Sequence, residues 1–224
     1  MKKFGIMLMA MILMLTMGGI NPLIESEEAR ADGQCAKREG IPAITMKLRG
    51  GSEGFTIGIG DVEKYHSGRD GCVGLSLGYR ACQIAFANLY AGEIPLRGDQ
   101  FVVCGTAKAC PGDAITYITG ARYGKGSEGA FNGNLVFDRS IGSSFSFIFA
   151  SMSTGKAVKL VGKYQFPKEY EELKSKSRND PEAMEKASKM TGTLVRTVLT
   201  APPGELYDVI PMPEFSWKTY KEKI

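Results

Sequence analysis

The residues with the clearest chemical potential lie in a glycine-rich stretch, residues 65–80, whose sequence is YHSGRDGCVGLSLGYR. It contains His66, the only histidine of the chain, and Cys72. Cys72 stands where the glycine-rich loop gives way to a helical pattern. Unpaired N–H groups and the dipole at a helix start favour negative charge. A thiol there tends toward the thiolate, the form that attacks electrophiles and binds metals.

A second cysteine occupies a similar position. Cys110 opens the sequence Cys-Pro-Gly-Asp, which is followed by a short helical pattern over residues 114–119. Proline suits the first position of a helix, where its missing N–H is not needed. We therefore place Cys110 at the N-cap of this helix and expect its thiol to lie close to the loop of Cys72.

Zinc accepts nitrogen and sulfur ligands of this kind, often with one position open to water in catalytic sites. We predict His66, Cys72 and Cys110 as metal ligands, with Cys72 or Cys110 as the catalytic nucleophile or ligand of an enzyme. Further side chains offer an oxygen ligand, a hydrogen bond or a positive charge to a bound molecule. They are Tyr79, Arg80, Asp113 and Lys125, the last of which would orient an anionic group.

Structural roles compete with these functional ones. The chain has no His-x-x-x-His or Cys-x-x-Cys pair, so the metal prediction rests on residue types rather than on spacing. In one alternative, Cys72 and Cys110 form a disulfide. Cys82 falls on a core stripe and Cys104 in an apolar strand, where both are expected to pack. Cys35 is either free or a disulfide partner, because an odd number of cysteines cannot all pair within one chain.

Charge and motifs exclude several function classes. The formal net charge is +4, and no basic stripe is interleaved with aromatic residues, so nucleic acid is not an expected partner. The Gly-Lys-Gly sequence at residues 124–126 lacks the Walker pattern, and no serine lies in a Gly-x-Ser-x-Gly elbow. With only one histidine, a multi-histidine site within one chain is excluded.

The N-terminal residues indicate a targeting segment. Lys2 and Lys3 precede an apolar run over residues 4–20, and Ala29-Arg30-Ala31 supplies small residues in an A-x-A arrangement. We interpret residues 1–31 as a secretory signal peptide, with an uncleaved membrane anchor as the alternative. The mature protein is then expected in the periplasm, with membrane contact only through an uncleaved signal, in a compartment where disulfides persist.

Two helical patterns are expected to frame the site. The first covers residues 73–91, where apolar residues recur at intervals of three and four. Gly74 and Gly78 indicate that backbone or ligand approaches closely at its first turns. The second helix begins at Asp180 as N-cap, with Pro181 at the first position, and extends to about residue 200.

Strand-like runs are mixed with these helices without strict alternation. They cover residues 100–105, 134–137, 145–152, 157–161 and 206–210. This order predicts an α+β fold with a mixed, largely antiparallel sheet packed with helices. The predicted domain spans residues 32–210, and a polar tail follows over residues 211–224, with Phe215 and Trp217 as its expected anchors.

Several short sequences point to a known family. GCVGLSLGYRA begins at Gly71, ACPGDAI at Ala109, TGARYGKG at Thr119, GNLVF at Gly133 and STGKAV at Ser153. In this order they resemble the FmdE family, which is named after a component of formylmethanofuran dehydrogenase. The resemblance implies an FmdE-like α+β core, commonly paired as a homodimer. Many members carry a separate C-terminal zinc finger, for which this chain has no cysteine after Cys110.

The chain also departs from the family's pattern, which is close to His-Gly-His-x-Cys-Pro-Gly. Tyr65-His66 resembles its start and Cys72-Val73-Gly74 its end, but the loop is longer and lacks a second histidine, and valine replaces proline. The family's Thr-Gly-Cys appears as Thr119-Gly120-Ala121. Cys72, Cys110 and Asp113 correspond best, whereas His66 corresponds only if the insertion is accommodated.

These features predict a periplasmic domain that binds a metal, or a small anionic or metal-containing cofactor, in a pocket lined by cysteine and histidine. Zinc is the first candidate, and haem with His66 as axial ligand, or another metal cofactor, is the alternative. A thiol- or zinc-dependent enzyme is a second hypothesis. A non-catalytic accessory protein of an exported redox complex is the third.

Overall fold

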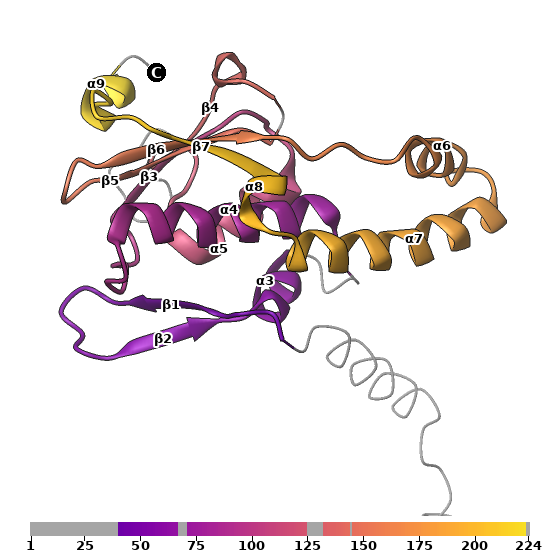
Figure 1. Cartoon of the computed structure of the whole chain (residues 1–224), viewed down its shortest axis with the longest axis horizontal. Coiled ribbons are helices and arrows are strands. Elements are labelled where there is room, and N and C mark those ends of the chain that lie inside the picture. The colour runs from indigo at the N-terminus through magenta and orange to yellow at the C-terminus, as the bar shows by residue number, and fades with distance from the viewer. Residues whose placement is uncertain (1–39, 67–70, 125–131, 144, 223–224) are drawn as a thin grey trace, which may run out of the picture. The chain divides into compact units, whose positions relative to one another are not determined.

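The structure of the protein is a computed structural model, shown in Figure 1. It describes residues 40–66, 71–124, 132–143 and 145–222. The described elements all belong to the unit Gly40–Ile224. The predicted signal peptide and Lys125 lie outside the described residues. None of the described helices combines the length and the apolar character that crossing a membrane requires.

Within the described residues, five strands form one sheet in the order β4-β3-β5-β6-β7. Their bounds are Gln100–Cys104 (β3), Leu135–Phe137 (β4), Phe147–Ser151 (β5), Ala157–Gly162 (β6) and Tyr207–Pro211 (β7). β3 and β4 are parallel and are connected through a helix, whereas the other neighbouring pairs are antiparallel. The predicted α+β class with a mixed, largely antiparallel sheet is confirmed.

The two faces of the sheet bury different side chains, because successive residues of a strand point to opposite faces. On β5, Phe147 and Phe149 belong to the main core, and Ile148 belongs to a second core. The main core is shared with α4 (Val73–Tyr90) and α5 (Ala109–Thr119). Figure 1 shows both helices on one side of the sheet. The sheet therefore supports the starts of the two helices that carry the cysteines.

The C-terminal segment covers the second core. Rings of Phe215 and Trp217 lie 6.5 Å and 6.3 Å from the ring of Phe101 on β3, which agrees with their expected role as anchors. The segment contains α9 (Trp217–Glu222), which the sequence pattern did not predict. The hydroxyl of Tyr220 donates to the carboxylate of Asp138, beyond the end of β4.

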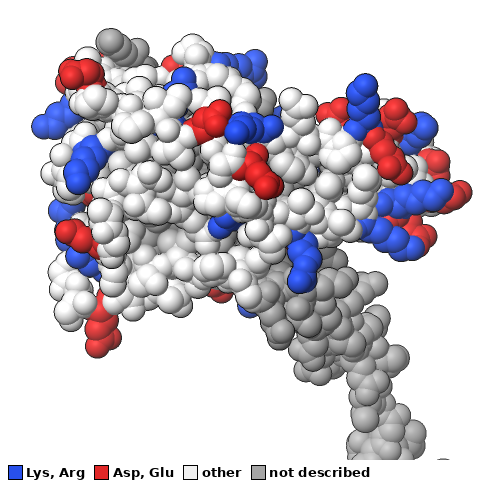
Figure 2. All heavy atoms as spheres, viewed as in Figure 1, with Lys and Arg blue, Asp and Glu red and all other residues white. Residues whose placement is uncertain are grey.

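The remaining elements lie around this core. A separate antiparallel hairpin pairs β1 (Ile44–Lys47) with β2 (Gly54–Ile57), and the short α3 (Ile59–His66) follows it. The C-terminal half contains α6 (Lys168–Lys176), α7 (Pro181–Thr200) and α8 (Pro203–Leu206). The predicted cap of α7 is confirmed, because the Asp180 side chain accepts hydrogen bonds from two backbone N–H groups. Figure 2 shows charges of both signs mingled where α6 and α7 lie.

Glycines allow α4 and α5 to approach each other closely. A Cβ atom added at Gly78 would lie 2.8 Å from the carbonyl oxygen of Pro111 and 3.0 Å from the Cβ of Ala114. Such distances are shorter than van der Waals contact, so only glycine fits at this position. The close approach expected from Gly74 and Gly78 is therefore an approach of the α5 backbone.

Replacing Gly78 with alanine is expected to destabilise the fold by about 1–3 kcal/mol, the usual effect of overpacking a filled interior. Gly192 on α7 is the matched control, because a Cβ there would meet nothing within 4 Å. Gly192→Ala should stabilise the protein by about 0.8–1 kcal/mol through helix propensity. Urea unfolding of both variants measures the two effects, and the same sign of change in both would contradict the packing argument.

Candidate metal centre

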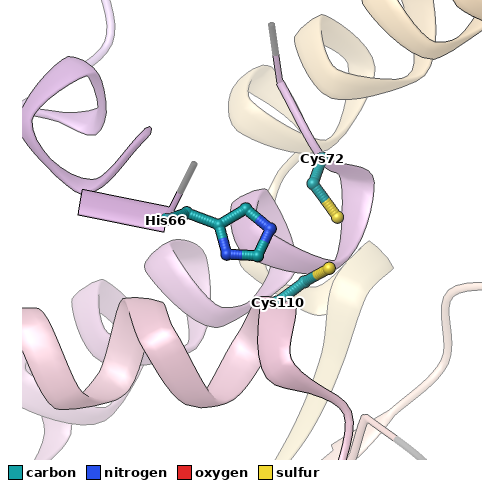
Figure 3. Close-up of side chains that lie close together, drawn as sticks. All are labelled: His66, Cys72 and Cys110. Atoms are coloured by element: carbon teal, nitrogen blue, oxygen red, sulfur yellow. The ribbon is translucent and has the colours of Figure 1, made fainter. Parts of the chain in front are cut away.

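Three side chains from separate helix ends meet beside the packed starts of α4 and α5. His66 is the last residue of α3, Cys72 is the N-cap of α4, and Cys110 is in the first turn of α5. One ligand atom from each residue lies within 4.8 Å of the others. Figure 3 shows the imidazole ring pointing toward both sulfur atoms. The structure thus brings the three predicted metal ligands together, each partly buried.

The position of Cys110 differs from the prediction. The N-cap of α5 is Lys108, and the helix begins at Ala109 rather than at residue 114. Pro111 is therefore the third residue of the helix, where the backbone N–H still has no intrahelical partner to lose. The proline signal located the first turn correctly but not the cap. Cys110 remains among the exposed N–H groups of a helix start.

Asp113 fixes the orientation of His66. The distance between Nδ1 of His66 and Oδ2 of Asp113 is 2.7 Å. A carboxylate accepts hydrogen bonds, so Nδ1 carries the proton and donates it, and Nε2 keeps a free lone pair. In Figure 3 the nitrogen that faces the two sulfurs is Nε2, the one not bonded to the ring carbon that carries the side chain. A carboxylate behind a histidine is a recurrent support of metal-binding histidines.

The two thiols are electrostatically unequal. The pKa of Cys72 is lowered to about 6, chiefly because the Cys110 thiol donates a hydrogen bond to it. Burial opposes this shift, whereas the backbone N–H groups of Leu75 and Gly74 and the charge of His66 support it. The pKa of Cys110 is raised, first by the same hydrogen bond and then by burial. In the metal-free state, Cys72 is the thiolate and Cys110 holds the proton.

This pKa difference predicts selective alkylation of metal-free protein. The rate at which iodoacetamide modifies Cys72 should reach half its maximum near pH 6, because only the thiolate reacts. Cys104 and Cys82 are fully buried, and burial raises the pKa of both thiols. They should stay unmodified in the folded protein. Peptide mass spectrometry across a pH series checks this, and a Cys72 midpoint above pH 8 would contradict it.

Glycines also shape the surroundings of the sulfurs. A Cβ at Gly74 would lie 3.1 Å from the Cβ of Cys110 and 3.6 Å from the Sγ of Cys72. The absence of that atom lets the start of α5 reach Cys72. Gly71 has a φ of +30°, which a residue with a side chain rarely adopts, and a Cβ there would lie 3.0 Å from Val195 of α7. The loop into α4 is therefore bounded by α7.

The other predicted ligand-binding residues do not join the cluster. The Tyr79 hydroxyl is directed to the backbone oxygens of Pro42 and Ile57. The guanidinium of Arg80 donates to Gln83 and to the carbonyl of Ala201. Lys125 is outside the described residues, and Asp113 lies at the site as the partner of His66.

One residue near the site escaped the sequence analysis. Glu63 is only 5% exposed and lies on α3, three residues before His66. Its Oε1 would lie 3.5 Å from a Cβ at Gly71, so its carboxylate is close to the loop of Cys72. The available signal was the spacing of three between an acid and the only histidine, which places both on one helix face.

The cluster suits a metal ion chemically. In a tetrahedral zinc site with Zn–S bonds of about 2.3 Å, two sulfur ligands lie about 3.8 Å apart. The observed separations of up to 4.8 Å therefore need only small side-chain movements. The described residues offer one nitrogen and two sulfurs here, which leaves a fourth position of a tetrahedral ion open.

The fold and the site define an α+β domain with a histidine–cysteine cluster that can hold a metal. The family described as "FmdE, Molybdenum formylmethanofuran dehydrogenase operon" matches residues 70–208, more than half of the chain. The chain therefore belongs to the FmdE family. The matched segment contains Cys72, Cys110 and Asp113, whereas His66 precedes it.

A solved structure is also similar to the chain. It is that of an FmdE-like protein of the tungsten formylmethanofuran dehydrogenase type from Syntrophus aciditrophicus, with 16% sequence identity and a TM-score of 0.38. The match covers 68% of this chain and 69% of the other. No curated protein matches the sequence.

Proposed function

We propose that the domain binds one divalent metal ion, zinc first, through Nε2 of His66 and the sulfurs of Cys72 and Cys110. The observation that carries this proposal is the convergence of these three atoms within 4.8 Å from three different helix ends. The hydrogen bond from His66 to Asp113 supports it, because it holds the lone pair of Nε2 on the side of the sulfurs.

The donor set favours zinc for two reasons. Two thiolates balance the charge of a divalent cation, and soft sulfur ligands combined with imidazole suit zinc better than calcium or magnesium. Three side chains that converge on one point also suit a bare ion better than haem, whose iron takes only axial ligands from protein. The fourth position would hold water or a small ligand, and bound zinc would lower the pKa of that water.

A thiol-dependent catalyst is the second candidate, and a separate observation favours it. The pKa of Cys72 is about 6, so its sulfur is a nucleophile at neutral pH in metal-free protein. The two candidates make opposite predictions for zinc. A metal site is protected from alkylation by stoichiometric zinc and has no function without it, whereas a thiol catalyst is inhibited by zinc.

We further propose that the mature protein acts in the periplasm as a homodimer. Export rests on the signal-like sequence of residues 1–31, and pairing rests on the resemblance to the family. Cell fractionation tests the first proposal, and recovery of the chain in the cytoplasm at full length would contradict it. Native mass spectrometry tests the second through the mass of the intact assembly.

Metal binding is tested by titrating reduced, chelator-treated protein with zinc and with cobalt. We expect one ion per chain and, for cobalt, a sulfur-to-metal charge-transfer band with ligand-field bands typical of tetrahedral sites. His66→Ala should lower the affinity and change the ligand-field bands. Binding with equal affinity in wild type and in the Cys72→Ser, Cys110→Ser double variant would overturn the proposal.

A further inference from the structure

The two cysteines of the metal cluster differ from the other described cysteines in access. Cys72 and Cys110 are partly exposed, whereas Cys82 and Cys104 have 0% exposure in the core. All four are free thiols in this structure. An oxidant in solution therefore reaches the cluster before it reaches either core cysteine, and the fold selects which pair can react.

The geometry also brings the two accessible thiols together. The Sγ atoms of Cys72 and Cys110 lie within 4.8 Å of each other, on the starts of two different helices. Gly74 leaves the space between them without a side chain. A disulfide needs the sulfurs at about 2.05 Å, so they must move closer. Cys72 can supply this movement, because it follows Gly71, whose backbone has the widest conformational freedom.

We propose that Cys72 and Cys110 form a reversible disulfide and that this bond and the metal ion exclude each other, which makes the centre a redox-gated metal site. The inference rests on the proposed metal-binding function. The physical reason is ligand identity, because a metal binds thiolates and a disulfide offers none. After oxidation only His66 would remain of the three ligands, and one imidazole does not retain zinc in this site.

The exchange needs an oxidant, for which a low-molecular-weight disulfide such as oxidised glutathione serves. One cysteine thiolate attacks a sulfur of this disulfide, which forms a mixed disulfide and expels one small thiolate. The second cysteine, as thiolate, then attacks the protein sulfur of the mixed disulfide and expels the other small thiolate. Two electrons pass from the protein to the oxidant, the protons of the protein thiols go to solvent, and the metal ion leaves.

The test uses the reduced protein, its Cys35→Ser variant and the Cys35→Ser, Cys110→Ser variant. Each is treated with oxidised glutathione, with and without one equivalent of zinc. We expect a Cys72–Cys110 disulfide in the first two proteins, identified by peptide mapping without reduction. The oxidised form should bind zinc more than about a hundredfold more weakly, since loss of a mere supporting residue already lowers affinity about 10–100-fold. Reduction with dithiothreitol should restore binding.

The outcomes separate this inference from the proposed function. If the reduced protein binds zinc but forms no Cys72–Cys110 bond, or if the oxidised protein binds zinc as tightly, the redox gate is wrong and metal binding stands. If the disulfide forms but the reduced protein binds no metal, both proposals fail and a simple dithiol remains. A disulfide between Cys35 and either site cysteine, lost in the Cys35→Ser variant, would also overturn the gate.

Discussion

Replacing Cys72 with serine is expected to lower the zinc affinity by more than about a hundredfold, beyond the roughly 10–100-fold effect of losing a residue that only supports a ligand. Serine has nearly the shape of cysteine, but its hydroxyl does not ionise near neutral pH and is a poor ligand for zinc. Cys110→Ser should have an effect of the same size. Competition with a chromogenic zinc chelator measures both affinities.

The two cysteine replacements should also be non-additive. Once one sulfur is lost, the remaining His66 and single thiolate bind zinc weakly, so the second replacement lowers the affinity by much less than the first. Cys35→Ser is the matched control and should bind zinc as the wild type does. Both site cysteines are partly exposed, so serine should change the free energy of unfolding by less than about 1 kcal/mol. A loss of affinity that follows a loss of stability would contradict a ligand role.

The sequence predicted the parts of the fold that depend on local pattern. The stripe of α4, the five strands of the sheet and the Asp180 cap were found because periodicity and capping are properties of neighbouring residues. The alternation on β5 predicted one apolar face. It did not show that Ile148, on the other face, is buried as well, because the covering residues come from the C-terminal segment, far away in sequence.

The candidate site was predictable in its sulfurs and less so in its histidine. Each cysteine stands at a helix start, which its own neighbours indicate, and Gly74 and Gly78 indicated close packing beside them. The contact between His66 and Asp113 joins residues far apart in the chain, so no local pattern specifies it. The altered loop before Cys72 made His66 the weakest match to the family's pattern, and the three-dimensional arrangement places it beside the sulfurs.

Replacing Asp113 with asparagine is expected to weaken zinc binding by about 10–100-fold, the usual effect of losing the carboxylate behind a metal-binding histidine. Asparagine keeps the size of the side chain but has no charge, and it can turn either its oxygen or its NH₂ group toward Nδ1. His66 is then no longer held with Nε2 facing the sulfurs. Calorimetric zinc titration measures the change, and Asp113→Ala should give a loss at the upper end of this range.

A purely structural role of Asp113 makes different predictions, so the two can be separated. With His66 and Asp113 side chains 18% and 35% exposed, the fold should tolerate the change. For the orienting role, cobalt-loaded Asp113→Asn should keep the charge-transfer band of the two sulfurs while its ligand-field bands change, because only the imidazole moves. Asp113→Glu should restore part of the affinity by returning the charge. Asp208→Asn, on the exposed strand β7, should leave both spectrum and affinity unchanged. An unchanged cobalt spectrum together with a lower unfolding temperature in Asp113→Asn would show that the carboxylate supports the fold rather than the ligand.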